Sequence, residues 1–273
     1  MTGTGPLISL LSDVGLRDPS AAIMRGVVLG IVPDARVIDI SHEVRKFSIR
    51  DGALLLWCVL PYLPVGFHVA VVDPGVGTAR LPVAVATARG DVLIGPDNGL
   101  LVGAASRLGG IAAVHVLEAD AYRLPTVSTS FHGRDVFAPA AAHLARGVPI
   151  ADLGRAVDPA ALVPSPIRDP DVSAGELRSS VVYVDTFGNV KLAGLRTDLE
   201  AAIGPVRPGD RLRLVVGGAR IDTSWQTTFG DVAVGETLVY EDSYGRLCLA
   251  ASQADAAAKH GIVDDLAVVI RRA

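Results

Sequence analysis

The hydrophobic positions of this chain follow two different patterns, and the change falls near residue 158. In the first part, short continuous apolar runs alternate with longer segments of helical spacing. The runs predict strands at 6–13, 35–41, 67–73, 81–88, 92–96 and 112–118, and the longer segments predict helices at 18–33, 49–61, 100–108 and 133–147. Strands that alternate with helices are typical of an α/β domain with a mainly parallel sheet and helices on both of its faces.

Two details of this first part concern turns. The runs at 81–88 and 92–96 predict a hairpin that turns around Arg89-Gly90-Asp91. At the start of the helix at 18–33, Asp18 is the predicted N-cap and Pro19 the first helical residue, because proline is favoured at that position.

The second part of the chain begins after a segment with little periodicity. Residues 158–175 ("DPAALVPSPIRDPDVSAG") contain four prolines, which predicts a linker. Beyond it, short β-like runs lie at 177–185, 210–218, 236–242, 245–250 and 266–272, together with one predicted helix that ends at Gly261. The predicted organisation is therefore an α/β domain at 1–160, a linker at 161–175, and a small all-β barrel domain at 176–273.

One stretch resembles a membrane span. Residues 53–72 contain no Asp, Glu, Lys or Arg. Because Pro61, Pro64 and Gly66 interrupt this stretch, it predicts a buried helix, a turn and a buried strand. The initial "MTGTGPL" has no basic region and precedes an apolar run that is too short for a signal peptide, so we expect a soluble, cytoplasmic protein without membrane contact.

Composition and charge narrow the classes of protein further. Of the 273 residues, 50% are hydrophobic but only 5% aromatic, so the core consists mainly of Ala, Val, Leu and Ile. The net charge of −4 and the scattered Lys and Arg residues argue against nucleic-acid binding. Cys58 and Cys248 lie far apart in apolar segments and are predicted to be buried free thiols.

Acidic residues end two of the predicted strands. Asp13 is the last residue of the first predicted strand and Asp73 that of the third, and parallel sheets bind ligands at the carboxyl ends of their strands. Either acid could instead cap a helix or bind loop amides. However, "DPGVGTAR" brings Arg80 close to Asp73 through Gly75 and Gly77, and a surface ion pair needs no glycine-rich corner after a buried strand. We therefore predict that Asp73 and Arg80 act together.

A histidine precedes the fourth predicted helix. His132 and Gly133 begin "HGRDVFAPAAAHLA", so the imidazole lies near helix-end amides that disfavour its charged form, and a neutral histidine can accept a proton. His132 could also merely cap the helix or pack. With Asp135, the histidine could suggest a metal site, but His143 is about three turns away, and no metal site is predicted.

The segment "VVYVDTFGNVKL" combines groups that suit a purine. Asp185, Phe187 and Asn189 offer a carboxylate, an aromatic face for stacking, and an amide for donor–acceptor pairing. A β-turn with Gly-Asn at its tip would explain the same residues. Further candidates in neighbouring polar turns are Phe229, Ser243 and Tyr244. The chain has no GK[ST] phosphate loop, no complete GxGxxG and no GxSxG, so any nucleoside is expected to be held by its base and ribose.

Taken in order, six motifs resemble those of one family. "SDVGLRD", "DPGVGTAR", "GPDNGLL", "SFHGRDVFAPAAAHLA", "YVDTFGNV" and "DSYGRLCLA" are similar to motifs of the S-adenosyl-L-methionine hydroxide adenosyltransferases, which are relatives of the fluorinases and chlorinases. The resemblance implies cleavage of S-adenosyl-L-methionine to adenosine and L-methionine by water or hydroxide, without a cofactor. It also implies a homotrimer that binds substrate between the large domain of one subunit and the small domain of its neighbour.

The same resemblance implies roles for individual residues. Asp73, Arg80 and His132 would be catalytic, with the proton acceptor either Asp73 or His132. Asp13 would bind the ribose and Asp185 the methionine ammonium. The other implied substrate-binding residues are Asp18, Phe47, Gly133, Phe187, Asn189, Phe229, Ser243 and Tyr244.

The acid and the histidine favour water over halide as the nucleophile. Halogenases of this family carry uncharged residues at the positions of Asp73 and His132, because a halide needs a dry anion pocket. Val14, Asp242 and Cys248 depart from the pattern of the hydrolytic relatives. The alternatives are a halide-using enzyme, a non-catalytic nucleoside-binding protein and a metal hydrolase.

Overall fold

The computed structural model describes residues 5–273, so residues 1–4, at the start of "MTGTGPL", lie outside it. The chain divides into two compact units, and the boundary in the sequence lies between Pro166 and Ile167. We call them the N-terminal and C-terminal units and describe each by itself. Within the described residues, no helix combines the length and the apolar character that crossing a membrane requires.

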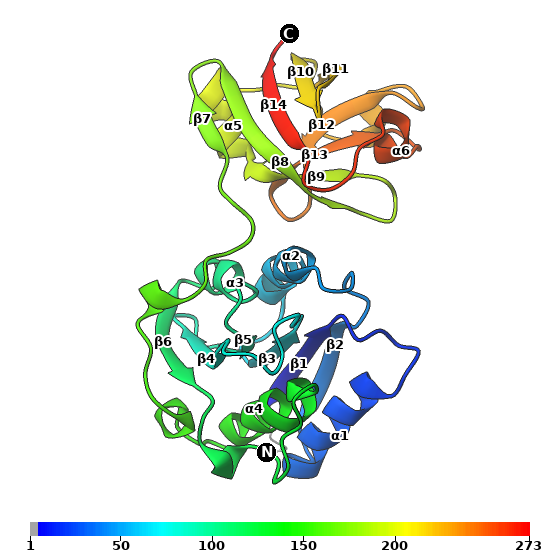
Figure 1. Ribbon diagram of the computed structural model, residues 1–273. Coiled ribbons are helices and arrows are strands. Elements are labelled where there is room, and N and C mark those ends of the chain that lie inside the picture. Colours follow the sequence, from blue (N-terminus) through cyan, green and yellow to red (C-terminus); the bar gives the residue numbers. More distant parts are fainter. Residues whose placement is uncertain (1–4) are drawn as a thin grey trace. The chain divides into compact units, whose positions relative to one another are not determined.

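The N-terminal unit is built on a mixed sheet of six strands, in the order β2-β1-β3-β5-β4-β6 (Figure 1). Its strands are β1 (Leu7–Ser12), β2 (Arg36–Ser41), β3 (Phe67–Val71), β4 (Pro82–Thr87), β5 (Val92–Pro96) and β6 (Ile111–Val116). The first four in that order pair in parallel, whereas β4 runs antiparallel to both of its neighbours. The predicted hairpin around Arg89-Gly90-Asp91 is confirmed as β4 and β5.

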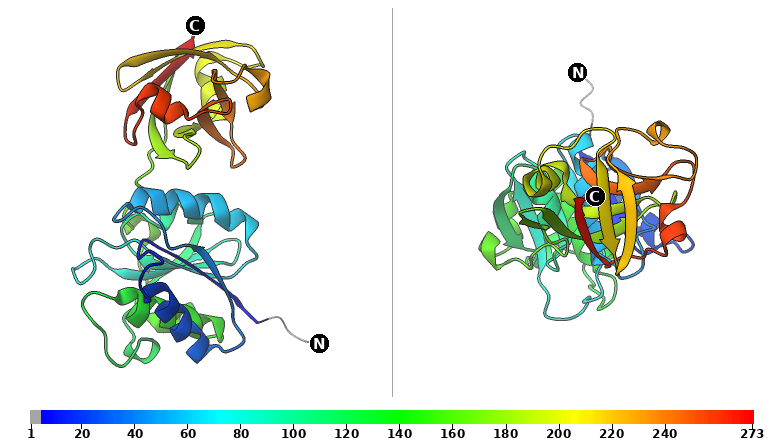
Figure 2. Two further views of the ribbon diagram at one scale, coloured as in Figure 1. Left: turned by 90° about the vertical axis from the view of Figure 1, so that its right-hand side faces the viewer. Right: turned by 90° about the horizontal axis from the view of Figure 1, so that it is seen from above.

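The longer helices of this unit pack in two pairs. They are α1 (Ser20–Ile31), α2 (Ile49–Val59), α3 (Val102–Arg107) and α4 (Ala138–Ala145). The helix α1 packs with α4, and α2 packs with α3, as can be followed in Figures 1 and 2. Each pair shares a separate hydrophobic cluster with the strands: Met24 and Phe137 belong to one cluster, Leu56 and Leu100 to the other.

Local sequence explains where these elements begin. The stretch 53–72 forms the end of α2, a short turn of 3₁₀ helix at Leu60–Tyr62 and then β3, which confirms the predicted helix, turn and strand. The helix α1 begins one residue later than predicted, at Ser20, with Pro19 as its N-cap. The Asp18 carboxylate still accepts a hydrogen bond from the Ser20 amide at 3.1 Å.

Cys58 and Cys248 are buried and not disulfide-bonded, as predicted.

The C-terminal unit is an antiparallel sheet that nearly closes into a barrel (Figure 2). Its main path is β11-β10-β14-β8-β9-β13-β12, and a bridge between Trp225 and Val239 brings the two end strands together. The strands are β7 (Asp171–Ser173), β8 (Glu176–Val184), β9 (Val190–Leu195), β10 (Arg211–Val216), β11 (Ala219–Ser224), β12 (Thr237–Glu241), β13 (Arg246–Ala251) and β14 (Ala267–Arg272).

The expectation of one helix in this unit is wrong. The predicted helix is α6 (Ala256–His260), which ends at Gly261 in the left-handed conformation. A second helix, α5 (Arg196–Ile203), follows β9 directly. Its polar sequence "RTDLEAAI" buries only Leu199 and Ala202, so it carried little hydrophobic periodicity.

Candidate functional site

Two acids lie at one edge of the N-terminal sheet. Strands β1 and β3 are parallel neighbours, and Ser12 pairs with Val71. Asp13 and Asp73 follow these two residues, so the chain brings both acids to the carboxyl ends of adjacent strands. This is the edge at which the sequence predicted a ligand site.

Arg80 connects Asp73 to His132. Its Nε donates to both Asp73 carboxylate oxygens at 3.0 Å, and its Nη2 also donates to Oδ2. The same Nη2 lies 2.9 Å from His132 Nδ1. The side chains of Arg80 and Asp73 are only 10% and 5% exposed, so solvent screens this pair weakly. The structure thus brings together the three residues that the sequence singled out as catalytic.

The contact with Arg80 determines how His132 carries its proton. A guanidinium can only donate hydrogen bonds, so His132 Nδ1 accepts, and a neutral ring then carries its proton on Nε2. Burial and the Arg80 charge lower the pKa of His132 below its usual 6.5, and this outweighs the opposing effect of Asp73. His132 precedes a turn of π-helix at Gly133–Phe137, a distortion that is frequent at functional sites.

A cavity of about 120 Å³ opens beside these groups. Its lining includes five of the predicted site residues: Asp13, Phe47, Asp73, His132 and Gly133. Arg80 is not among the lining residues, although it contacts both Asp73 and His132, which are. Asp18 is also not among them, and its carboxylate binds the Ser20 amide instead.

Asp13 and Phe47 are connected through the backbone. The Phe47 amide donates to Asp13 Oδ2 at 2.8 Å. Phe47 has a φ of +65°, which is unfavourable for a residue with a β-carbon, and its side chain stays 72% exposed. Backbone strain of this kind persists where surrounding contacts fix it, and it is common at ligand sites.

Asp135 organises the loop that carries His132. It is fully buried and accepts hydrogen bonds from the Ser128 amide at 2.9 Å and the Ser128 hydroxyl at 2.8 Å. Arg134 Nε donates to its other oxygen at 2.6 Å. The sequence had suggested Asp135 only as part of a metal site. No group of three or more His, Cys, Asp or Glu side chains within residues 5–273 is arranged to hold a metal ion.

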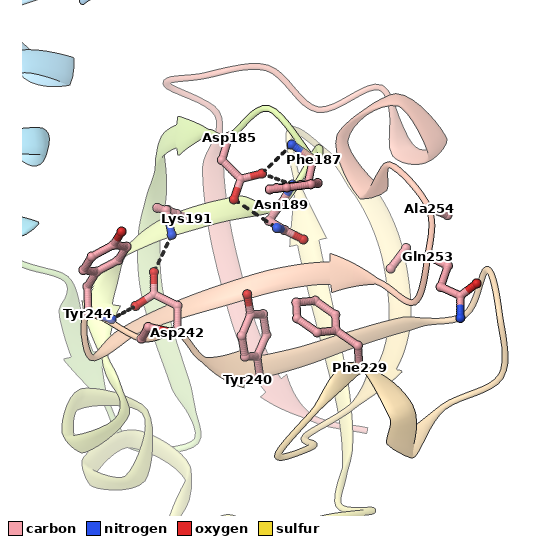
Figure 3. Close-up of a pocket in the computed structure, with 12 residues that line it drawn as sticks. Asp185, Phe187, Asn189, Lys191, Phe229, Tyr240, Asp242, Tyr244, Gln253 and Ala254 are labelled. Carbon is pink, nitrogen blue, oxygen red and sulfur yellow. Dashed lines mark hydrogen bonds and ion pairs between the residues drawn. The ribbon is translucent and has the colours of Figure 1, made fainter. Parts of the chain in front are cut away.

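A second and larger pocket, of about 750 Å³, lies in the C-terminal unit (Figure 3). All the site residues that the sequence predicted in this unit line it, namely Asp185, Phe187, Asn189, Phe229, Ser243 and Tyr244. Other lining residues were not predicted as site residues: Lys191, Tyr240, Asp242, Ala251, Gln253 and Ala254. The alternation of side chains along β9, which brings Asn189 and Lys191 to one face, was the available signal for Lys191.

Asp185 shapes the turn at one end of this pocket. Its Oδ1 accepts from the Phe187 amide at 2.9 Å and from the Asn189 amide at 3.0 Å, while Oδ2 accepts from Asn189 Nδ2 at 3.0 Å (Figure 3). The Asn189 side chain is thereby oriented, and among residues 5–273 its carbonyl oxygen and one N–H have no hydrogen-bond partner and can bind a ligand. Phe187 is 76% exposed, which leaves its face open for stacking.

The fold and the two pockets define an α/β unit joined to a nearly closed antiparallel barrel, each with its own cavity that polar and aromatic side chains line. The chain belongs to the S-adenosyl-L-methionine hydroxide adenosyltransferase family: the model of the family's N-terminal domain matches residues 8–154, and that of its C-terminal domain matches residues 179–268.

Individual relatives agree with this membership. The chain is 43% identical to a protein from Salinispora tropica named (R)-S-adenosyl-L-methionine hydrolase, over 94% of each chain. It is 38% identical to a protein of the same name from Thermus thermophilus, over 96% of this chain and 98% of the relative. A fluorinase from Actinoplanes is 30% identical over 98% of both. An uncharacterized conserved protein from Thermotoga maritima has a crystal structure with a TM-score of 0.89 and 33% identity, covering 97% of this chain and all of that one.

Proposed function

We propose that this protein is a hydrolase that cleaves S-adenosyl-L-methionine to adenosine and L-methionine by attack of water on the ribose C5′. The observation that carries this proposal is the bridge from Asp73 through Arg80 to His132 at the wall of the N-terminal cavity. It links a carboxylate and an imidazole that line the same cavity, a combination that suits a water molecule and opposes a halide ion. Family membership and the names of the hydrolytic relatives support the same reaction.

The reaction has a simple balance of bonds and charges. The water oxygen bonds to C5′ while the C5′–S bond breaks. The electron pair of the broken bond stays on sulfur and converts the sulfonium into the neutral thioether of methionine. The water proton passes to Asp73 and then to solvent. Asp73 is the acceptor in this proposal because the one acceptor nitrogen of His132, Nδ1, already accepts from Arg80, which leaves Nε2–H as a donor that orients the water. The Asp73 carboxylate also accepts from Arg80, but its two oxygens have a lone pair to spare. Holding the water in line with the breaking bond contributes on the order of several kcal/mol.

The two pockets divide the substrate between them. Asp13 holds the ribose hydroxyls near Phe47, and Gly133 and Asp18 lie on the same side of the substrate. In the C-terminal unit, Phe187 and Phe229 stack on adenine, and Asn189 pairs with its edge. Asp185, Ser243 and Tyr244 receive the amino acid portion. The (R) prefix in the relatives' names refers to the configuration at sulfur, and we extend that preference to this chain.

We further propose a homotrimer in which each site combines the N-terminal unit of one subunit with the C-terminal unit of its neighbour. The support is that catalytic groups and base-binding groups belong to different compact units. In the same proposal the α1–α4 and α2–α3 pairs cover opposite faces of the sheet. The protein needs no cofactor in this scheme and acts in the cytoplasm.

Labelled water tests the reaction directly. In oxygen-18 water, with each epimer of S-adenosyl-L-methionine in turn, the label is expected in the adenosine 5′-hydroxyl, with the (R) epimer consumed faster. Asp73→Ala and His132→Ala are expected to lower kcat about a hundredfold or more, and to change KM far less.

A 5′-chloro or 5′-fluoro product in the presence of the halide would instead identify a halide-using enzyme. Tight adenosine binding with no methionine release would identify a binding protein.

A further inference from the structure

A buried ion pair lies in the wall of the C-terminal pocket. Lys191 Nζ is 2.5 Å from Asp242 Oδ2, and the two side chains are only 10% and 4% exposed. Lys191 follows Asn189 by two positions, at the start of β9, and Asp242 directly follows β12. In Figure 3 the pair lies beside Tyr244, on the side of the pocket opposite Gln253 and Ala254. The roles proposed above use neither member of the pair.

The charges of this pair are unequally satisfied. Asp242 Oδ2 binds Lys191, while Oδ1 accepts from the Tyr244 amide at 2.9 Å and the Arg246 amide at 3.0 Å. The Lys191 ammonium has three N–H donors, and within residues 5–273 it donates one hydrogen bond, to Asp242. Burial lowers the pKa of Lys191, but Asp242, Cys248 and Asp185 together raise it more, so the net shift of the pKa is upward and the ammonium keeps its charge. The Lys191 ammonium therefore retains two N–H donors with which it can bind an anionic ligand.

We propose that Lys191 binds the α-carboxylate of the substrate's amino acid portion and so selects for substrates that retain this group. The inference rests on the proposed function, because it assumes that this pocket receives that portion. Lys191 then acts as a specificity-determining residue, with Asp242 fixing the position of its ammonium.

Charge balance favours this occupant. Asp185, Lys191 and Asp242 together contribute two carboxylates and one ammonium to the pocket, a net charge of −1. S-adenosyl-L-methionine carries a sulfonium, an ammonium and one carboxylate, a net charge of +1. Its ammonium can meet Asp185 while its carboxylate meets Lys191, so both charges of the amino acid portion gain an opposite partner. Adenine and ribose are uncharged and offer no anion to the lysine.

Decarboxylated S-adenosyl-L-methionine is the probe that tests this assignment, because it lacks only the carboxylate. The measured quantity is the ratio of kcat/KM for S-adenosyl-L-methionine to that for the decarboxylated analogue. Charge-assisted hydrogen bonds have strengths that predict a ten- to hundredfold lower ratio in Lys191→Gln, that is, on the order of 1.4–2.7 kcal/mol. Lys191→Arg is expected to retain most of the ratio. Lys259→Gln, which removes a lysine outside the pocket lining, is the matched control.

A purely structural ion pair would lower activity on both substrates equally and leave the ratio unchanged in Lys191→Gln, and this result would overturn the inference. If that variant does not fold, Lys191→Gln combined with Asp242→Asn removes both charges and gives the same comparison.

If the wild-type protein released no methionine from either substrate, the proposed function would fail on its own. Calorimetric affinities for the two compounds would then supply the ratio, and an equal preference in wild type and variant would overturn the inference.

Discussion

At the scale of single residues, the position of one proton on His132 decides the roles in the N-terminal cavity. Arg80 occupies the Nδ1 lone pair, so His132 donates through Nε2 and Asp73 remains the group that can accept. Protonation of His132 would set its Nδ1–H against a guanidinium donor and break this contact. In the proposed mechanism the neutral ring is therefore the active form.

This arrangement predicts an acid limit for activity. The pKa of His132 lies below 6.5 because burial and Arg80 disfavour the imidazolium. As the pH falls, the neutral ring therefore persists below the range in which an ordinary histidine becomes charged. A profile of kcat/KM against pH is expected to fall on the acid side with a midpoint below 6.5. A midpoint above 6.5 would contradict the proposed contact. A His132→Gln variant should move this limb to lower pH, because only the Asp73 carboxylate then titrates on the acid side.

At the scale of elements, a buried polar chain joins the central strands of the N-terminal sheet. Ser9 on β1 lies 2.7 Å from His68 Nδ1 on β3, and His68 Nε2 lies 3.0 Å from Asp91. Arg89 Nε donates to the other Asp91 oxygen at 2.7 Å. Ser9, His68 and Asp91 are fully buried, so this network holds β1, β3 and the β4–β5 hairpin together without taking part in the cavity.

Removing the carboxylate should therefore destabilise the N-terminal unit. Asp91→Ala leaves buried partners without their acceptor and is expected to lower the free energy of unfolding by about 3–5 kcal/mol, measured by urea denaturation. Burial raises the pKa of Asp91, but His68 and Arg89 lower it more, so its folded value lies below its unfolded one. Its contribution is thus complete above about pH 4 and is lost as the pH falls further. Asp120→Asn, at a side chain that is 96% exposed, is the control and should change little.

The sequence predicted best those elements that form a continuous apolar run. It missed β9, which is buried at five of its six positions, because Lys191 and Gly194 interrupt its run. Strand β1 is buried at every position, and its continuous apolar run made it recognisable. Strand β11 is exposed at half of its positions, and helix α5 buries only Leu199 and Ala202, so neither had a strong hydrophobic pattern.

For the candidate site, predictability depended on how far apart the residues lie in the sequence. Asp73 and Arg80 are seven positions apart in one motif, whereas the Arg80–His132 contact spans 52 positions and required the fold.

At the scale of the whole molecule, the proposed trimer implies that one active site needs two chains. Asp73→Ala removes the acceptor from the N-terminal unit, and Phe187→Ala removes the stacking face from the C-terminal unit. Each variant alone is expected to lose most of its activity. Co-expressed in mixed trimers, the two variants are expected to recover a substantial fraction of wild-type activity, because some sites pair an intact N-terminal unit with an intact C-terminal one. Mixed trimers no more active than the single variants would rule out shared sites.

Each unit also has hydrophobic clusters of its own, with no residue shared between them. If the proposed roles hold, substitutions that change the nucleophile in one unit need not disturb nucleoside binding in the other. Proteins named as hydrolases and as fluorinases both occur among the relatives of this chain, in keeping with that division of roles. A chimera that joins the first 166 residues of this chain to the second unit of a halogenase should inherit its nucleophile from the first parent.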